Sequence, residues 1–233
     1  MVPALLKEFV RRSFPRPFVE LAEAIRYAGL PEPFRSVRSY SLLSNLNLFF
    51  LQELARRVDI EGIEGDFVEC GVYRGGSAGV LAHQMLRSKM KRRLWLFDAF
   101  AGMPAATQED DHYSHAIEGR FVGSERDTHR VLRRIGLPED SYKVVVGWFD
   151  ETLPQSDCTR IALLHVDCDF YDPVRLVLER LYPSLQPGGY VILNDYGSFQ
   201  GCRKATDEFL PSIGSPQLIQ IDHDAYYFRK MSR

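Results

Sequence analysis

Short apolar runs alternate with segments of helical periodicity from about residue 60 to the end of the chain. Runs of near-continuous apolar residues indicate strands that are buried on both faces, as in a parallel sheet covered by helices. Strands are expected over residues 66–71, 93–98, 142–147, 161–167 and 189–195, and helices over 77–86, 124–135, 172–185 and 201–210. The alternation therefore predicts an α/β fold with a mostly parallel sheet flanked by helices.

Two further runs near the C-terminus are related differently. Residues 217–222 and 225–230 are separated only by His223 and Asp224. A two-residue connection is too short for a helical crossover and suits an antiparallel hairpin. The sheet is therefore expected to end in an antiparallel strand.

The first part of the chain has helical periodicity broken by Pro15, Pro17, Pro31 and Pro33. We interpret residues 1–38 as an N-terminal helical cap and residues 39–233 as the main domain. Within that domain, the stretch 39–58 carries apolar residues at i, i+3 and i+4 spacing, which predicts an amphipathic helix. Its apolar face is expected to contain Leu42, Leu43, Leu46, Phe49, Phe50 and Leu54.

Composition argues against several classes of protein. The chain has 29 Lys and Arg against 31 Asp and Glu, a formal net charge of −2, and a pI of about 6.3. This balance argues against a general nucleic-acid surface. No apolar stretch approaches the roughly 18 residues of a membrane-spanning helix, and the N-terminus lacks a signal-peptide pattern. The four cysteines have no C-x-x-C spacing, so we expect reduced thiols and a cytoplasmic protein.

The helix expected after the fourth strand has signals at both ends. Asp172 is placed to cap it, Pro173 fits its first turn, and residues 187–189 (Pro-Gly-Gly) are expected to end it. The carboxylates just before Asp172 therefore lie at the carboxyl end of a strand. Open α/β sheets bind their ligands at this edge.

The turn after the first expected strand, from Glu69 to Ser77, contains glycines and opens with an acid. It lacks the G-x-G-x-x-G pattern with which dinucleotide-binding folds hold a pyrophosphate. An acid at the strand tip suits a ligand with an ammonium group or hydroxyls. The second strand ends in Asp98, whose carboxylate is suited to accept both hydroxyls of a ribose. A tight turn without a ligand is the alternative interpretation.

Four oxygen-bearing side chains lie at the tips of the fourth and fifth expected strands: Asp167, Asp169, Asn194 and Asp195. Adjacent parallel strands place such tips close to each other. Oxygen donors without His or Cys suit a hard cation such as Mg²⁺. Without a cation, this many carboxylates at neighbouring tips would repel each other. The alternative is that the acids cap helices or bind water.

Six segments of the chain occur in an order that is typical of one enzyme family. They are GDFVECGVYRGGS, LWLFDAFAGMP, GWFDETLP, LLHVDCDFYD, LYPSLQPGGYVILNDYGSFQGCRKATDEF and ID-x-x-x-YYFRK. Together they resemble the macrocin O-methyltransferase (TylF-type) family of S-adenosylmethionine-dependent enzymes, which methylate sugar hydroxyls of natural products. The resemblance covers roughly residues 39–230. It implies a class I methyltransferase (Rossmann-like) fold with S-adenosyl-L-methionine as cofactor.

The resemblance also implies roles for individual residues. Asp167, Asn194 and Asp195 occupy the family's divalent-metal positions, so Mg²⁺ is the implied metal. The family usually has two aspartates where this chain has Asn194-Asp195, and serine where it has Ala99. The glycine turn is similar to the family's methionine-binding turn, Asp98 to its ribose acid and residues 147–149 to its adenine-flanking segment. The implied cofactor-binding residues are Glu69, Cys70, Gly71, Val72, Tyr73, Gly75, Ser77, Asp98, Trp148 and Phe149.

The long irregular stretch 101–123, beside the implied cofactor strand, is expected to form a lid over the acceptor. It contains His112 and His115, which are candidate catalytic bases because imidazole titrates near neutral pH. Asp169 is the competing base, as a carboxylate beside the implied metal ligand Asp167. Solvated loop histidines without a catalytic role are the alternative.

These inferences predict an S-adenosylmethionine-dependent O-methyltransferase. It would act on a hydroxyl of a small molecule, above all a sugar moiety of a glycosylated natural product, with divalent metal assistance. An NAD(P)-dependent dehydrogenase on a similar sheet is disfavoured by the missing G-x-G-x-x-G and Tyr-x-x-x-Lys patterns. A non-catalytic ligand-binding relative is the third interpretation. The N-terminal helices either pack against a second subunit in a homo-oligomer or cap their own core.

Overall fold

Seven strands form one sheet in the computed structural model, which describes residues 29–231. The order across the sheet is β3-β2-β1-β4-β5-β7-β6. Strands β1 to β5 are parallel, and β7 runs antiparallel between β5 and β6. The expected parallel sheet with an antiparallel C-terminal strand is confirmed. The strands span Asp66–Cys70 (β1), Leu94–Asp98 (β2), Tyr142–Val146 (β3), Ile161–Val166 (β4), Leu185–Leu193 (β5), Ile219–Gln220 (β6) and Tyr226–Arg229 (β7).

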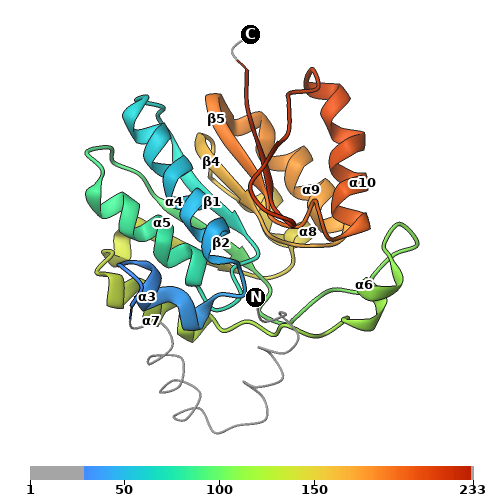
Figure 1. Cartoon of the computed structure of the whole chain (residues 1–233), viewed down its shortest axis with the longest axis horizontal. Coiled ribbons are helices and arrows are strands. Elements are labelled where there is room, and N and C mark those ends of the chain that lie inside the picture. The colour runs from blue at the N-terminus through green and yellow to red at the C-terminus, as the bar shows by residue number, and fades with distance from the viewer. Residues whose placement is uncertain (1–28, 232–233) are drawn as a thin grey trace, which may run out of the picture.

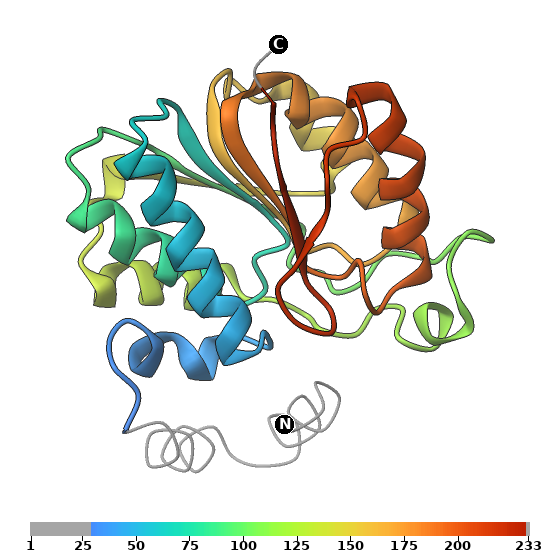
Figure 2. The same ribbon diagram turned by 45° about the horizontal axis from the view of Figure 1, so that its top comes forward.

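Helices cover both faces of the sheet (Figure 1, Figure 2). Helices α3, α4, α5 and α7 form one layer, and α8, α9 and α10 form the other. The short helix α6 lies apart from both layers, on the long connection between β2 and α7. No helix within the described part of the chain is long and apolar enough to cross a membrane. The helices span Phe34–Val37 (α3), Asn45–Ile60 (α4), Gly76–Arg87 (α5), His112–Ala116 (α6), Glu125–Ile135 (α7), Phe149–Thr152 (α8), Tyr171–Leu181 (α9) and Gln200–Phe209 (α10).

Two apolar clusters, one on each side of the sheet, hold the layers together. Along β4, Leu163 belongs to the cluster beneath α4, and the next residue, Leu164, belongs to the cluster beneath α9. Successive side chains of a strand point to opposite faces, so a strand covered on both sides needs apolar residues at every position. This explains the near-continuous apolar runs of the sequence.

Helix α4 begins later than expected and buries a different face. Its N-cap is Ser44, whose hydroxyl accepts a hydrogen bond from the Asn47 amide at 3.0 Å. The expected face was wrong at Leu46 and Phe49, which are 46% and 51% exposed. Apolar residues occur on two sides of this helix, so periodicity alone allowed either face. The buried face consists of Asn47, Leu48, Leu51, Leu54, Ala55 and Val58.

The boundaries of α9 and β5 also differ from the expectation. Phe170, not Asp172, occupies the N-cap position of α9, and Asp172 lies in the first turn, where it pairs with Arg175. Helix α9 ends at Leu181, and residues 187–189 lie inside β5 instead of following the helix. The register between β4 and β5 shifts across this segment. A strand tolerates proline at such an irregularity.

The turn between β1 and α5 brings the tips of β1 and β4 into close contact. Gly71 has a φ of +91°, and a Cβ atom there would lie 1.7 Å from the carbonyl oxygen of Asp167. Gly75 has a φ of +85°, and its Cβ atom would lie 2.7 Å from Cα of Thr128. Close contacts within the protein therefore require glycine at both positions, whether or not a ligand also approaches the turn.

The predicted cap over residues 1–38 falls largely outside the described residues, and so do the N-terminal helices considered for contacts between subunits. Of this segment, the structure describes α3, which packs against α5 and α7. The four cysteines are buried free thiols, as the sequence predicted.

We expect Leu54→Ala to lower the free energy of unfolding by about 2–5 kcal/mol, because it removes a fully buried side chain from the core. Phe49→Ala, on the exposed side of the same helix, should change this free energy by no more than roughly 0.5 kcal/mol. Urea unfolding monitored by circular dichroism measures the free energy of unfolding of both variants. An equal loss for the two variants would contradict the buried face of α4 described above.

Candidate active site

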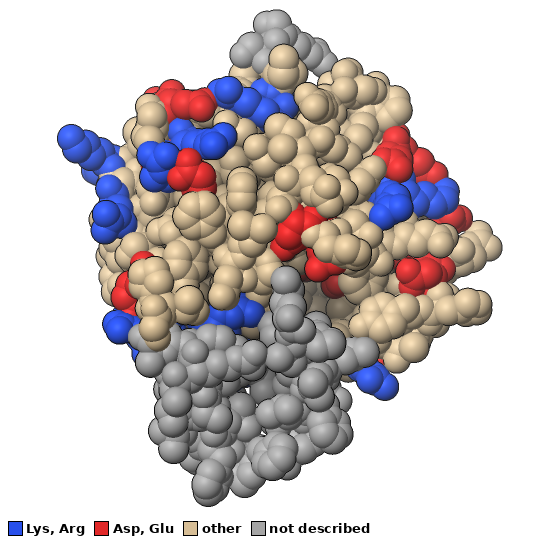
Figure 3. All heavy atoms as spheres, in the orientation of Figure 1, with Lys and Arg blue, Asp and Glu red and all other residues tan. Residues whose placement is uncertain are grey.

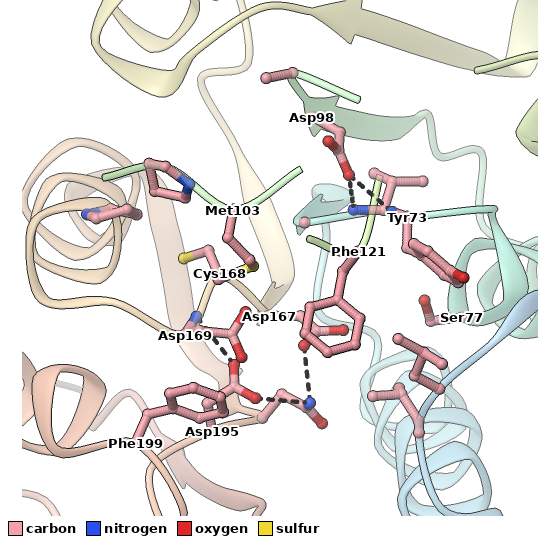
Figure 4. A pocket seen from close by; sticks show the side chains of 18 of the residues that line it. Tyr73, Ser77, Asp98, Met103, Phe121, Asp167, Cys168, Asp169, Asp195 and Phe199 are labelled. Atoms are coloured by element: carbon pink, nitrogen blue, oxygen red, sulfur yellow. Dashed lines mark hydrogen bonds between the residues drawn. The ribbon is translucent and has the colours of Figure 1, made fainter. Parts of the chain in front are cut away.

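A cavity of about 940 Å³ opens at the carboxyl ends of the parallel strands. Its lining comes from the segments that follow β1, β2, β3, β4 and β5, from the N-terminus of α4 with the residues just before it, and from the β6–β7 loop. Figure 4 shows two groups of side chains at this cavity, one around Asp98 and the other around Asp167. This is the edge at which open α/β sheets bind ligands.

Asp98 organises the turn between β1 and α5. Its Oδ2 atom accepts hydrogen bonds from the backbone N–H groups of Val72 and Tyr73, both at 2.7 Å. Its Oδ1 atom accepts a third from Phe100 N–H at 2.6 Å. Burial raises the pKa of Asp98, and these three backbone donors act in the opposite direction. The carboxylate predicted for ribose binding therefore lines the cavity and already holds the turn.

Glu69 lies behind this turn and does not line the cavity. Its Oε1 atom is 3.0 Å from Nδ1 of His165 on β4, and both side chains are fully buried. Burial lowers the pKa of His165, but the hydrogen bond and the charge of Glu69 outweigh it and raise the pKa overall. The structure thus places Glu69 in a buried pair inside the sheet, and Cys70 and Gly75 also lie outside the lining.

The other predicted cofactor residues meet at one side of the cavity. Trp148 and Phe149 come directly after β3, which pairs with β2. The backbone N–H of Gly147 donates to the carbonyl oxygen of Asp98 at 3.1 Å and so holds this segment beside Asp98. Aromatic surface and a carboxylate are therefore close together. The predicted residues in the lining are Gly71, Val72, Tyr73, Ser77, Asp98, Trp148 and Phe149.

The acidic residues at the tips of β4 and β5 come together as expected. The Nδ2 atom of Asn194 donates to Asp167 Oδ1 at 2.8 Å and to Asp195 Oδ1 at 3.2 Å. The backbone N–H of Asp169 donates to Asp195 Oδ2 at 3.3 Å. All four residues line the cavity. The amide of Asn194 therefore bridges two carboxylates.

Burial makes the charges of this cluster costly. It is the largest cause of a strongly raised pKa at Asp167, with the charge of Asp195 adding to it. Burial and the charge of Asp169 raise the pKa of Asp195 in the same way. Burial and the charge of Asp167 raise the pKa of Asp169 to about 8. Each carboxylate thus binds a proton, or another positive charge, more readily than in water.

The lid stretch contributes apolar and aromatic side chains to the cavity, but not its histidines. His112 and His115 are exposed on α6 and do not line the cavity. Between them, Tyr113 does line it, and its ring lies 5.8 Å from that of Phe199. The lining also includes Met103 and Phe121 from this stretch (Figure 4).

Two parts of the lining escaped the sequence analysis. One is the N-terminus of α4, from which Asn47 reaches the carboxylate cluster and donates to Oδ1 of Asn194. The other is the β6–β7 loop with Asp222 and Asp224. Asn47 was the one usable signal in the sequence. It is a polar residue among the apolar residues of a buried helix face, and such a residue needs a hydrogen-bond partner.

Negative charge dominates the lining. Among residues 29–231, the one basic side chain in the lining is that of Arg175, which pairs with Asp172 and Glu179. Figure 3 shows acidic atoms near the centre of one face, away from the basic groups towards its edges. Such a cavity favours cationic ligands over anionic ones. The acidic residues that the described part of the chain contributes to the lining are Asp98, Asp150, Asp167, Asp169, Asp172, Asp195, Asp222 and Asp224.

The strand order, the antiparallel final strand and the cavity at the strand tips define a class I methyltransferase fold. The solved structure of the O-methyltransferase NovP matches with a TM-score of 0.76 and 28% identity, over 83% of this chain and 83% of that chain. The sequence profile of the family described as Macrocin-O-methyltransferase (TylF) matches residues 19–230. The chain belongs to this family.

Two characterised relatives agree with this assignment. Mycinamicin III 3''-O-methyltransferase of Micromonospora griseorubida is 31% identical over 205 residues, 82% of this chain and 79% of the relative. The 8-demethyl-8-(2,3-dimethoxy-alpha-L-rhamnosyl)-tetracenomycin-C 4'-O-methyltransferase of Streptomyces olivaceus is 33% identical over 191 residues, 77% of this chain and 71% of the relative. The resemblance seen in the sequence is confirmed, and the enzyme class is that of S-adenosylmethionine-dependent O-methyltransferases.

The electrostatic character of the cavity can be measured through its tryptophan. The chain has two tryptophans: Trp148 lines the cavity and is 41% exposed, whereas Trp95 is 2% exposed. We expect caesium ions to quench the fluorescence at least roughly threefold better than iodide, relative to free N-acetyltryptophanamide, because the carboxylates attract cations. The ratio of caesium quenching to iodide quenching should approach one in about 1 M salt, which screens the carboxylates.

Variants provide the control for this measurement. Asp150→Asn removes one carboxylate from the lining and should lower the ratio. Asp157→Asn changes an exposed carboxylate that does not line the cavity and should leave the ratio unchanged. Equal quenching by the two ions in dilute buffer would contradict an acidic cavity.

Proposed function

We propose that the protein transfers the methyl group of S-adenosylmethionine to a hydroxyl of a sugar moiety in a glycosylated natural product. The observation that carries the proposal is that one cavity is lined both by the Asp98 turn and by the carboxylates at the β4 and β5 tips. The first group suits a nucleoside cofactor, and the second suits a hydroxyl that must lose its proton. A relative named for a rhamnosyl-bearing tetracenomycin supports a sugar acceptor.

The residues after β1, β2 and β3 would hold the cofactor. Asp98 offers carboxylate oxygens to ribose hydroxyls, and Trp148 and Phe149 offer aromatic surface to an adenine. S-adenosylmethionine, when bound, supplies its methyl group from a positively charged sulfonium, which the acidic lining favours.

We assign Asp169 as the base. Its carboxylate lies in the cavity beside Asp195, whereas neither His112 nor His115 lines it. As the acceptor oxygen forms its bond to the methyl carbon, the carbon–sulfur bond breaks and the sulfur keeps the electron pair. The hydroxyl proton passes to a carboxylate oxygen of Asp169.

The donor set of the cluster fits a divalent cation held by Asp167, Asn194 and Asp195. All three side chains carry oxygen, the donor that Mg²⁺ prefers, and the buried carboxylates repel each other. Within residues 29–231, no group of three or more His, Cys, Asp or Glu side chains is arranged to hold a metal. The amide oxygen of Asn194 would therefore have to complete the set. A bound cation would polarise the acceptor hydroxyl.

Cofactor binding tests the central part of the proposal. S-adenosylhomocysteine should bind with at least micromolar affinity in calorimetric titration. Asp98→Ala should weaken it about tenfold or more, because hydrogen bonds to a charged group contribute roughly 1.5–3 kcal/mol. Asp157→Ala, at an exposed site away from the cavity, should bind like the wild type.

Two results would contradict this assignment. One is an unchanged dissociation constant for Asp98→Ala with a normal circular dichroism spectrum. The other is binding of NAD in place of S-adenosylhomocysteine, which would favour a dehydrogenase. Asp98 also holds the turn through the backbone amides of Val72 and Tyr73. Asp98→Asn keeps an acceptor oxygen, so its affinity for S-adenosylhomocysteine should lie between those of the wild type and Asp98→Ala.

Metal binding forms a separate prediction. Chelation by EDTA should lower methyl transfer, and added Mg²⁺ should restore it. Asn194→Asp adds a negative charge and should tighten Mg²⁺ binding roughly tenfold, whereas Asp167→Asn should weaken it, because ligand charge sets affinity. Calorimetric titration with MgCl₂ measures both. Full activity after exhaustive chelation would show that Asp169 acts without a metal.

A further inference from the structure

The buried side chain of Asn47 lines the cavity but has no role so far. It belongs neither to the residues proposed to bind the cofactor nor to the proposed base. It lies on the first turn of α4, lines the cavity and is 2% exposed. Its Nδ2 atom donates a hydrogen bond to Oδ1 of Asn194, 147 residues later in the chain. Its own Oδ1 atom is buried without a hydrogen-bond partner. A buried amide oxygen without a partner is unfavourable, so its presence needs a reason beyond packing.

The position of Asn47 is set by contacts that do not involve its amide group. The hydroxyl of Ser44 accepts the Asn47 backbone N–H at 3.0 Å and donates to Asp222 Oδ2 at 2.5 Å. These bonds tie the first turn of α4 to the β6–β7 loop at the cavity. The next residue, Leu48, is fully buried. Backbone and neighbours therefore hold the Asn47 side chain against Asn194.

Two facing amides have to pair a donor with an acceptor. Because Asn47 presents its NH₂ group, Asn194 presents its oxygen to Asn47 and its own NH₂ group to the carboxylates. That NH₂ group lies 2.8 Å from Asp167 Oδ1 and 3.2 Å from Asp195 Oδ1. In this arrangement, the Asn194 amide donates to one carboxylate oxygen of Asp167 and one of Asp195.

A cation at these carboxylates needs the opposite arrangement, because it is bound by the oxygen of an amide and not by the NH₂ group. Turning the Asn194 amide brings its oxygen to the carboxylates and its NH₂ group to Asn47. If the Asn47 amide turns as well, its unpartnered Oδ1 atom becomes the acceptor.

We infer that Asn47 is a positioning residue that supplies a hydrogen-bond partner to the Asn194 amide whichever of its atoms faces Asp167 and Asp195. It holds Asn194 in either orientation and couples the change between them to cation binding. The inference rests on the proposed function and specifies its metal site.

The test uses the full chain with S-adenosylhomocysteine bound and measures Mn²⁺ affinity by electron paramagnetic resonance. Asn47→Leu can neither donate nor accept and should weaken Mn²⁺ binding about tenfold, with an unchanged affinity for S-adenosylhomocysteine. Asn45→Leu, at an exposed position of the same helical turn, is the matched control and should bind Mn²⁺ like the wild type. Asn47→Ala provides the same test if the leucine variant does not fold.

A second background separates orientation from packing. Asn194→Asp places two equivalent oxygens at this position, so that no amide remains to be oriented. In that background, Asn47→Leu should change Mn²⁺ affinity by less than about threefold. An equal loss in both backgrounds, or no loss in the wild-type background, overturns the inference.

The wild-type protein distinguishes this inference from the proposed function. If S-adenosylhomocysteine binds and Mn²⁺ does not, the positioning role is overturned and the methyltransferase proposal stands. If S-adenosylhomocysteine does not bind, both fail.

Discussion

Three aspartate carboxylates, one buried and two half-buried, meet in the cavity at the tips of β4 and β5, and the site depends on how their charges are stabilised. Asp167, Asp169 and Asp195 are withdrawn from water, which raises the pKa of each. A proton, an amide hydrogen bond or a cation can stabilise such a group. The chain supplies the Asn194 amide, and through it the carboxylates are connected to Asn47 on α4.

The carboxylates are also tied to the cofactor side of the cavity through the backbone. Asp167 N–H donates to the carbonyl oxygen of Cys70 at 2.9 Å, and Gly71 leaves room for the Asp167 carbonyl group. The next two residues, Val72 and Tyr73, donate their N–H groups to Asp98. The two sides of the cavity are therefore joined through one hydrogen-bonded stretch of backbone. Methyl transfer needs such a connection, because donor and acceptor react only when they are closely aligned.

Side-chain direction explains where the structure differs from the sequence analysis. Glu69 comes one residue before the end of β1, and its side chain lies on the same face of the sheet as that of its register partner His165, with which it pairs. Leu46 and Phe49 carry the apolar character of a buried face, yet α4 packs through Leu48, Leu51 and Leu54. In both cases, the residue type was compatible with two directions. The packing of neighbouring elements selected one of them.

The sequence by itself determined the main architecture: a parallel sheet, an antiparallel last strand, and acids at Asp98, Asp167 and Asp195 close to the strand tips. These follow from local periodicity and from the rule that parallel strands end at one edge. Only the tertiary structure placed Asn47 against Asn194, brought the β6–β7 loop to the cavity and left His112 exposed outside it. Those contacts join segments far apart in the chain, and they depend on how helices and loops pack, which local patterns do not encode.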